Sequence, residues 1–488
     1  MPTLVIEADS VLDNSLHHIG NNIAVDTATG VVIGIDRGEI SYAKTVKIKG
    51  YVFPGFIDAH IHLTGTGIKL LGASLENTRD PEEIGRLLAG VSGSIVYGRG
   101  WDQESFNTPG TIPTRRILDK YVQDRPAIAV RVCGHMAVAN TLALRIVEPQ
   151  KKYPKFVDAE KGILLEDAVE YTVNTLLERN GNTIEYVHAA LKELAETGIA
   201  GLSSMSCTPS EYRSLITISR QRNILQKVSC YPDYYRINEF QEIPDPNISL
   251  AGIKLYADGS FGAHTAALEE PYADKETHGQ LLLTSKEIEK IAREALSRNL
   301  RVAIHAIGDL AISEVLEAYE RLGLSDHGRI EHFSLADDGD IVRASALGVH
   351  IVVQPYFRIG DWWLDKRLGI GRALETYRYR TMLRNRVKLS FSTDSPVDPY
   401  QPWETLRAAY SDCDTILCNE NESLSPKEAF KAYTIMAAKA SGGTVSELGK
   451  LEVNTNISSI AWSPNDPSNK EWRGPARLLP LVLQDKLL

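Results

Sequence analysis

The sequence predicts an α/β protein built around a (β/α)₈ barrel (TIM barrel), and two observations lead to it. Short β-branched or apolar runs recur along the chain with helical stretches between them, the pattern of a parallel α/β architecture. Eight such runs can be counted, and amphipathic segments such as 285–297 and 311–322 lie between some of them. The chain of 488 residues, 43% of them hydrophobic, has room for a barrel of about 250 residues and further domains. The eight runs are 56–62, 199–205, 226–231, 252–257, 301–306, 329–333, 349–354 and 388–393.

The segments outside these runs predict two further parts of the molecule. The connection from the first run to the second is longer than a barrel requires, so an inserted α/β subdomain is expected, with strand candidates at 94–97 and 128–132. Short strand patterns near both termini, at 23–26, 31–35, 45–48 and 457–462, are expected to pair into one small β-domain. The predicted domains are the composite β-domain, 1–53 plus 443–488; the barrel, 54–64 plus 183–442; and the insertion, 65–182.

Composition and charge argue against nucleic acid and membranes as partners of this protein. Lys and Arg number 53 against 63 Asp and Glu, a formal net charge of -10, and no basic run is interleaved with aromatic residues, so nucleic acid is not an expected partner. The N-terminus lacks the basic segment of a signal peptide, and no apolar stretch reaches the length of a membrane span. We therefore expect a cytoplasmic protein with a small-molecule substrate and no membrane partner. A homodimer is compatible with the sequence, which leaves the oligomeric state open.

Cysteine usage favours a reducing compartment. The five cysteines are scattered and odd in number, which predicts free thiols rather than a disulfide framework. A pair between Cys413 and Cys418 is the alternative that the spacing leaves open.

His60 and His62 form the first part of a predicted metal site. On a β-strand successive side chains alternate between faces, so His60 and His62 project the same way and can bind one cation through neutral imidazoles. The pair alone is a weak signal, because such pairs also arise by chance. In a (β/α)₈ barrel the active site lies where the C-terminal ends of the strands meet. The stronger signal is therefore a set of residues in or just after other predicted strands, namely Lys254, His305, His332 and Asp394.

Lys254 is expected to face the barrel interior, since Ile253 and Leu255 would face the helical shell. A buried ammonium group must be paired, or its pKa must fall until the amine is neutral. A neutral amine can add carbon dioxide, and the resulting carbamate is an anionic oxygen ligand that can bridge two cations. An ion pair between Lys254 and Asp258 is the alternative interpretation.

His305 and His332 each end a predicted strand and would supply nitrogens to a second cation. Asp394 follows a strand and precedes a loop that contains a proline, so it could both bind a metal and accept a proton. Taken singly, each histidine could equally be a hydrogen-bonded core residue, and the aspartate a helix cap or turn residue.

Several short motifs, in order along the chain, carry a family resemblance. They are PGFIDAHIH at 54–62, GWD at 100–102, Gly134-His135 with Asn140, KLYADGS at 254–260, HAIGD at 305–309, Glu331-His332, Gln354-Pro355 and STDSP at 392–396. So ordered a set resembles the amidohydrolase superfamily of metal-dependent hydrolases. It is most similar to the amidohydrolase-3 branch, the YtcJ-like proteins that include N-substituted formamide deformylases. The resemblance covers nearly the whole chain.

The resemblance implies a (β/α)₈ barrel with a composite β-domain and a site for two divalent ions, usually zinc. By that likeness one metal is held by His60, His62 and Asp394, and the other by His305 and His332, with carboxylated Lys254 as the bridge. A hydroxide shared by both metals would attack the substrate carbonyl. Asp394 would take its proton and pass it to the leaving nitrogen, so Asp394 is the expected catalytic residue.

Two departures from the branch's pattern concern substrate recognition. Cys133 stands where an acidic residue is common, and Ala263-His264 replace an arginine-like position. His135, by likeness to the branch, and Trp101 and His264, by proximity to motifs, are the predicted substrate-binding residues. Packing or surface roles are their alternative.

The expected activity is hydrolysis of a C–N bond other than a peptide bond, in an amide, formamide or cyclic amide. A deaminase of the same superfamily is a weaker alternative, because such enzymes carry a glutamate at the position that Gly308 occupies. A lactonase, esterase or phosphotriesterase would use the same metal geometry. A regulatory or binding protein on the same scaffold is the non-enzyme alternative, although all six expected ligands are present.

Overall fold

The computed structural model describes residues 3–36, 43–132, 134, 136–180, 183–221, 224–410, 415 and 417–487. The chain forms two compact units. The first comprises Met1–His62, Leu191–Tyr212 and Ile216–Leu488, and the second Leu63–Ala190 and Arg213–Leu215.

The first unit holds two parallel sheets whose strands follow the predicted runs. One has the order β15-β14-β13-β6, with β6 Phe56–Ile61, β13 Ile199–Met205, β14 Lys227–Tyr231 and β15 Ile248–Leu250. The other has the order β16-β17-β18-β19-β20, with β16 Gly252–Tyr256, β17 Arg301–Ala306, β18 Gly328–His332, β19 His350–Val353 and β20 Lys388–Phe391. All eight predicted runs are confirmed as strands, and β15 is an additional one. The strands β6, β13 and β18 are buried along their whole length, as is typical of parallel sheets covered on both faces.

Backbone hydrogen bonds join these two sheets at both edges. At one junction the Asp394 N–H donates to the His60 carbonyl at 2.8 Å, and the His62 N–H donates to the Ser395 carbonyl at 2.9 Å. At the other, the Lys254 N–H donates to the Pro232 carbonyl at 2.8 Å. Residues far apart in the sequence therefore meet at the C-terminal ends of the strands.

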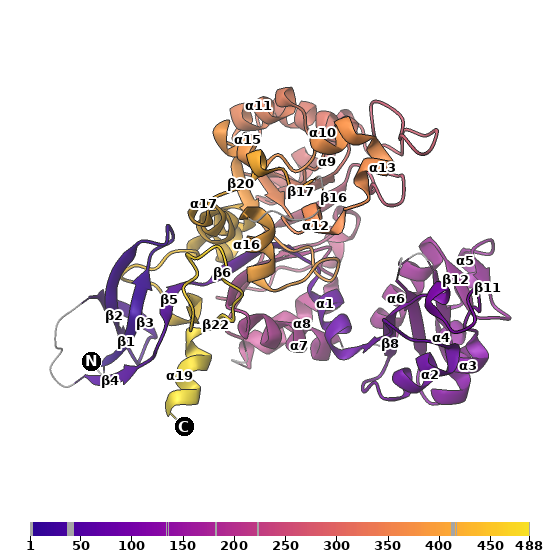
Figure 1. The fold of residues 1–488 in the computed structure, drawn as a ribbon, viewed down its shortest axis with the longest axis horizontal. Helices are drawn as coiled ribbons and strands as arrows, with labels where there is room; N and C mark the ends of the chain where they lie inside the picture. The colour runs from indigo at the N-terminus through magenta and orange to yellow at the C-terminus, as the bar shows by residue number, and fades with distance from the viewer. Residues whose placement is uncertain are drawn as a thin grey trace. The chain divides into compact units, whose positions relative to one another are not determined.

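Helices follow the strands of the second sheet. The predicted amphipathic segment 285–297 is confirmed as α9, Ser285–Ser297, which begins at a capping box of Thr284 and Glu287. The next helix, α10 (Asp309–Leu322), ends at Gly323, whose left-handed φ of 61° suits glycine. It is followed by α11 (Asp338–Leu347), and α9 and α10 both pack against β17 (Figure 1).

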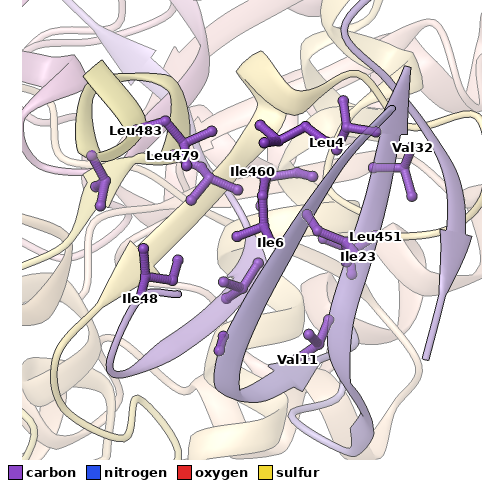
Figure 2. Packing of buried hydrophobic residues seen from close by; sticks show 14 residues of the cluster. Leu4, Ile6, Val11, Ile23, Val32, Ile48, Leu451, Ile460, Leu479 and Leu483 are labelled. Atoms are coloured by element: carbon purple, nitrogen blue, oxygen red, sulfur yellow. The ribbon is translucent and has the colours of Figure 1, made fainter. Parts of the chain in front are cut away.

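A third sheet of the first unit combines strands from both ends of the chain. Its order is β22-β21-β5-β1-β2-β3, with β4 beside β1. The strands are β1 Thr3–Leu12, β2 His18–Asp26, β3 Val31–Ile35, β4 Lys44–Lys47, β5 Tyr51–Pro54, β21 Ile460–Ser463 and β22 Arg477–Leu478. The final helix, α19 (Leu479–Leu487), adds to the same hydrophobic core, where Ile6 and Ile23 from the N-terminal strands pack with Ile460 and Leu479 (Figure 2).

The second unit is built on its own six-stranded sheet, in the order β11-β12-β10-β9-β8-β7. Its strands are β7 Ala73–Ser74, β8 Val96–Trp101, β9 Ala127–Arg131, β10 Met136–Ala139, β11 Val157–Asp158 and β12 Ile163–Leu165. The helices include α1 Leu63–Leu71, α2 Pro81–Ala89, α3 Arg115–Tyr121, α4 Thr141–Val147 and α6 Asp167–Asn180. The unit thus contains mixed α/β structure within the segment where an insertion is expected.

Two remaining sequence expectations concern thiols and membranes. Cys207 and Cys230 are free and buried, as predicted. Cys418 is disulfide-bonded, so the prediction of free thiols is wrong there, because an odd total does not prevent a single pair. Cys133 and Cys413 lie outside the described residues. Within the described ranges, none of the helices combines the length and the apolar character needed to cross a bilayer.

Candidate metal centre

The structure brings all six predicted ligands to one cavity of the first unit. This cavity has a volume of about 510 Å³. Most of the six side chains are almost fully buried, so their polar atoms depend on one another or on a ligand. The residues are His60, His62, Lys254, His305, His332 and Asp394.

Asp394 lies between two histidines. Its Oδ1 is 3.3 Å from His60 Nε2 and 3.2 Å from His62 Nε2. This buried oxygen has no hydrogen-bond partner among the described residues. Burial acts to raise the pKa of Asp394, but the two histidines outweigh it and hold that pKa well below its usual value. An ionised carboxylate oxygen without a donor, beside imidazole nitrogens, is a fitting position for a cation.

Potential ligand atoms of His60, His332 and Asp394 all lie within 4.8 Å of one another. Imidazole nitrogens with a carboxylate oxygen form a donor set that suits zinc and similar divalent ions. This group unites His60 and His332, which the family resemblance assigns to different ions. The residues present therefore fit a metal.

Glu331 orients His60. One Glu331 carboxylate oxygen, Oε2, lies 2.6 Å from His60 Nδ1 and so leaves Nε2 directed at Asp394. Arg329 donates to the same carboxylate at 2.5 and 2.9 Å and to the Ala59 carbonyl at 2.5 Å. Burial acts to raise the pKa of Glu331, but Arg329 and the hydrogen bond with His60 hold it well below the usual range. A carboxylate behind a ligating histidine fixes the ring and raises its basicity.

His332 is oriented by an amide. Its Nδ1 lies 2.8 Å from Gln354 Oε1, and the Gln354 amide N–H₂ donates to Ser392 Oγ at 2.9 Å. This chain of hydrogen bonds assigns the donor role to Nδ1 and leaves Nε2 as a lone pair for a ligand. His332 has a φ of 73° and Asp394 one of 56°, both in the left-handed region that side chains other than glycine rarely adopt. Such strain is characteristic of functional positions.

His305 uses the opposite ring nitrogen. Its Nε2 donates to the Gly259 carbonyl at 2.9 Å, so Nδ1 is the nitrogen left for a ligand. Burial, followed by the charge of Lys254, lowers the pKa of His305 to about 3, and burial also lowers that of His332 well below its usual value. Both rings are therefore neutral near pH 7, as metal ligation requires.

Lys254 is buried in the same cavity at 1% exposure. Burial lowers the pKa of its amine to about 8, against the opposing pull of Glu331 and Asp394. The alternative ion pair with Asp258 is not found among the described residues. Asp258 instead accepts hydrogen bonds from three backbone amides, including that of Gly308 at 2.8 Å. About half of the Lys254 amine is thus neutral near pH 8.

A second buried aspartate holds the loop that carries Asp394. The Asp58 carboxylate accepts hydrogen bonds from the Thr393 hydroxyl at 2.6 Å and the Thr393 N–H at 3.1 Å. Burial raises the pKa of Asp58 to about 7. Asp58 is fully buried on β6, two residues before His60, so it fastens the Asp394 loop to the strand that carries two ligands.

Comparisons with known proteins now bear on this site. The sequence model of the amidohydrolase family matches residues 49–454, most of the chain. The chain belongs to the amidohydrolase family. It is 27% identical to YtcJ of Bacillus subtilis (strain 168) over 425 residues, which cover 80% of each chain. It is 25% identical to the N-substituted formamide deformylase of Arthrobacter pascens, over 86% of this chain and 85% of that protein. The crystal structure of an uncharacterized metal-dependent hydrolase from Pyrococcus horikoshii OT3 superposes with a TM-score of 0.86 at 31% identity, covering 96% of this chain and 98% of the other.

The three predicted substrate-binding residues of this amidohydrolase are not among the described residues that line the cavity. Trp101 is fully buried in the core of the second unit, where its indole N–H donates to the Ala129 carbonyl at 3.0 Å and its ring stacks on Phe106. No face of this side chain is left for a substrate, so the structure corrects its role to packing. His135 lies outside the described residues. His264 pairs with Asp274 at 3.0 Å and is not one of the described residues that line the cavity. Its binding role stays a prediction.

Sequence reasoning missed the residues that orient the ligands. Glu331 and Gln354 stand in motifs of the amidohydrolase resemblance, but no role was predicted for them. The signal for Glu331 is its spacing from Arg329, because residues i and i+2 of a strand share a face and two opposite charges there can pair. The partners of Gln354 and Asp58 come from distant segments, so neither has a local signal.

Proposed function

We propose that this amidohydrolase is a metal-dependent enzyme that hydrolyses a non-peptide C–N bond in an amide, formamide or cyclic amide. The observation that carries the proposal is the buried group of His60, His332 and Asp394, in which Asp394 Oδ1 has no hydrogen-bond partner among the described residues. Family membership and the formamide deformylase relative support the substrate class. The Pyrococcus horikoshii structure, named a metal-dependent hydrolase, supports the cofactor.

His60, His332 and Asp394 would hold one divalent ion, most simply zinc. His62, His305 and Lys254 line the same cavity and would complete the site for a second ion. When bound, the ions supply a Lewis acid that polarises the substrate carbonyl and lowers the pKa of water, so that hydroxide is available near neutral pH.

Asp394 is the proposed proton carrier. Its low pKa keeps the carboxylate ionised and able to accept a proton from water as the oxygen adds to the carbonyl carbon. The same proton then passes from the Asp394 carboxyl to the departing nitrogen as the C–N bond breaks. The products are a carboxylate or formate and an amine, and the aspartate is restored.

After carboxylation, Lys254 would supply an anionic oxygen ligand to the ions. Its amine, with a pKa near 8, is neutral often enough to attack carbon dioxide, forming a carbamate and releasing one proton. The carbamate replaces a buried cation by an anion, which suits a site crowded with metal charge.

We further propose that the strands of the two parallel sheets close as the (β/α)₈ barrel that the sequence predicts. The hydrogen bonds between the segments of β6 and β20, and the contact of Lys254 with Pro232, support this closure.

The test is metal analysis of the purified protein followed by a screen of N-formyl amines, N-acyl amines, cyclic imides, lactones and phosphotriesters. We expect bound metal, chelator-sensitive turnover of at least one C–N substrate, and little or none of the others. A metal-loaded protein that cleaves only lactones or phosphotriesters, or nothing at all, contradicts the proposal.

A variant of Asp394 tests the mechanism. Asp394→Asn should lower kcat about 10²-fold or more, because the amide cannot carry the proton, while at least one metal stays bound. Asp338→Asn, at an 81% exposed side chain on α11, is the matched control and should retain full activity. An unchanged kcat in Asp394→Asn would reject the proton-carrier role.

A further inference from the structure

The wall of the cavity beyond the six ligands is both acidic and aromatic. Its charged side chains, among the described residues, are Asp361 and Asp398, and no lysine or arginine joins them there. The rest of the described wall is largely aromatic, with Tyr256, Phe261, Phe357, Trp363 and Tyr377. Carboxylates and aromatic faces together attract organic cations.

From this wall we infer that the substrate of the metal centre carries a protonated amine on an apolar or aromatic body, and that Asp361 binds this ammonium group. The inference rests on the proposed function and specifies its substrate class. An anionic substrate would meet the Asp361 carboxylate on this wall, so the same group also discriminates against acids.

A continuous series of contacts leads from the metal centre to Asp361. The His332 ring stacks on Phe357, with 5.9 Å between ring centroids and 5° between planes. Phe357 then meets Tyr377 edge to face at 6.4 Å. The Tyr377 hydroxyl donates to Asp361 Oδ2. A substrate with its carbonyl beside His332 can therefore lie along these rings with its far end toward Asp361.

The position of Asp361 is set by a short helix. It directly follows α12 (Phe357–Gly360), and its N–H donates to the Phe357 carbonyl at 2.9 Å. Residues four apart in a helical turn share a face, so the phenyl ring and the carboxylate line the same wall. Asp361 Oδ1 has no hydrogen-bond partner among the described residues, which leaves it for a ligand.

Asp398 adds a second negative charge nearby. A Cβ built on Gly360, the residue before Asp361, would lie 3.7 Å from Asp398 Oδ1, so Asp398 lies beside the end of the helix that precedes Asp361. Burial raises the pKa of Asp361 to about 6, which still leaves it ionised at pH 7 and above. An incoming ammonium group would be stabilised by the ionised Asp361 carboxylate.

The neighbouring arginines do not neutralise this wall. Arg358, on α12 itself, is fully buried and donates to the carbonyls of Leu417, Ala408 and Asn419. Arg367 is paired with Asp274 and lies 5.6 Å from the centre of the Trp363 ring. Arg358 and Arg367 thus bind groups other than Asp361.

An independent sign of a polar ligand is Ser334. Its side chain lines the cavity at 2% exposure, and its hydroxyl has no hydrogen-bond partner among the described residues. The Ser334 carbonyl accepts from the Tyr377 N–H at 3.1 Å, which holds Tyr377 at a left-handed φ of 55°. A buried hydroxyl without a partner beside a strained aromatic residue is expected where a bound molecule completes the hydrogen bonding.

Three formamides of similar length test the inference in the metal-loaded protein. They are the mono-formamide of para-xylylenediamine, which is cationic, para-ethylbenzylformamide, which is neutral, and para-(formamidomethyl)phenylacetate, which is anionic. We expect kcat/KM for the cation to exceed that for the neutral compound by about tenfold, the usual effect of one hydrogen bond to a charged group, and the anion to be worst. A neutral or anionic compound that is turned over as well as the cation overturns the inference.

Asp361→Asn assigns the preference to its residue. The variant should lose most of the tenfold advantage of the cation over the neutral formamide, through a higher KM for the cation. Asp338→Asn is the control and should keep the preference. A preference retained in Asp361→Asn refutes the role of that carboxylate.

A binding measurement separates this inference from the proposed function. Calorimetry should show that benzylammonium binds the metal-loaded protein about tenfold more tightly than benzyl alcohol, and that Asp361→Asn removes the difference. If no C–N substrate is turned over but this binding is seen, the proposed function fails and the cation site stands. If formamides are cleaved but benzylammonium binds no better than the alcohol, the cation site fails and the proposed function stands.

Discussion

Three histidines of the candidate metal centre, His60, His305 and His332, each use one ring nitrogen for a hydrogen bond within the protein. The other ring nitrogen is left for a ligand. His60 and His332 are held through Nδ1, by Glu331 and Gln354, whereas His305 is held through Nε2 by the Gly259 carbonyl. The choice of nitrogen differs because the partners approach from different strands. In each case a neighbouring acceptor fixes the tautomer that exposes a lone pair to the cavity.

Glu331→Gln tests this orienting role. The change removes the carboxylate behind His60 and leaves the buried Arg329 charge without its partner. We expect metal affinity to fall about 10- to 100-fold and the free energy of unfolding to fall by about 3–5 kcal/mol. Competition with a chromophoric chelator and denaturant unfolding measure the two effects.

The control for Glu331→Gln is Glu317→Gln, which removes the carboxylate of an exposed ion pair with Arg321 on α10. It should change neither the free energy of metal binding nor the free energy of unfolding by more than about 1 kcal/mol. Metal affinity in Glu331→Gln equal to that of the unchanged protein would show that His60 is oriented without the carboxylate.

Lys254→Ala tests the carbamate. Removing the amine should abolish turnover and the binding of a second ion, since no other described residue offers an anionic oxygen at that place in the cavity. Added formate, acetate or propionate should restore part of both, because a short carboxylate fits the space of the missing carbamate. The same acids should not stimulate the unchanged protein. Undiminished activity of Lys254→Ala would exclude the bridging role.

At the scale of elements, hydrophobic patterning predicted the strands that carry the ligands. All eight predicted runs are strands, because parallel strands buried on both faces leave long apolar stretches in the sequence. The strands outside the two parallel sheets were harder to predict. The ten-residue β1 (Thr3–Leu12) was missed, since its pattern is broken by acidic and polar residues on the exposed face, and β8 (Val96–Trp101) begins two residues later than the predicted start.

The candidate site was predictable to the same extent as its strands. The six predicted ligands could be named because each lies in or just after a strong apolar run. Glu331, Gln354 and Asp58 could not be given roles, because their roles depend on partners that only the folded chain brings near. Trp101 shows the opposite error, since closeness to a motif in sequence placed it in the pocket while its ring packs in another unit.

The strand β19 carries a buried histidine that should make the fold sensitive to acid. His350 is 2% exposed, and burial together with Arg301 and Lys388 lowers its pKa to about 3 from the usual 6.5. Between these two values the unfolded chain binds a proton that the folded chain does not, so stability falls as pH falls, by up to about 1.4 kcal/mol per pH unit. The loss begins as pH drops through the unfolded pKa near 6.5.

His350→Gln should therefore weaken the acid sensitivity. Denaturant unfolding of the metal-free protein at pH 7 and pH 5 should show a loss of unfolding free energy that is about 1–2 kcal/mol smaller in the variant. His327→Gln, at an exposed histidine just before β18, is the control and should keep the full loss. An identical loss in His350→Gln would mean that other groups set the acid response.

At the scale of the whole molecule, the candidate metal centre holds buried polar groups that the protein alone does not satisfy. The first unit contains the entire cavity, whose lining includes Asp394 Oδ1 and the Ser334 hydroxyl, both without a hydrogen-bond partner among the described residues. Unpaired buried polar atoms reduce stability until a ligand completes their bonding. Metal binding and folding of this unit are thus expected to be coupled.

Removal of the metal should lower thermal stability reversibly. A ligand that binds only the folded state at about a hundred times its Kd contributes about 2.7 kcal/mol, so chelation should lower Tm by a few degrees and added zinc should restore it. Calorimetric scans of metal-free and reloaded protein at fixed pH measure the shift. His60→Ala should remove it, because the variant lacks a ligand of the group formed by His60, His332 and Asp394, whereas His327→Gln should retain it. A Tm that is the same with and without metal would mean that the cavity is satisfied without an ion, and the hydrolase proposal would lose its main support.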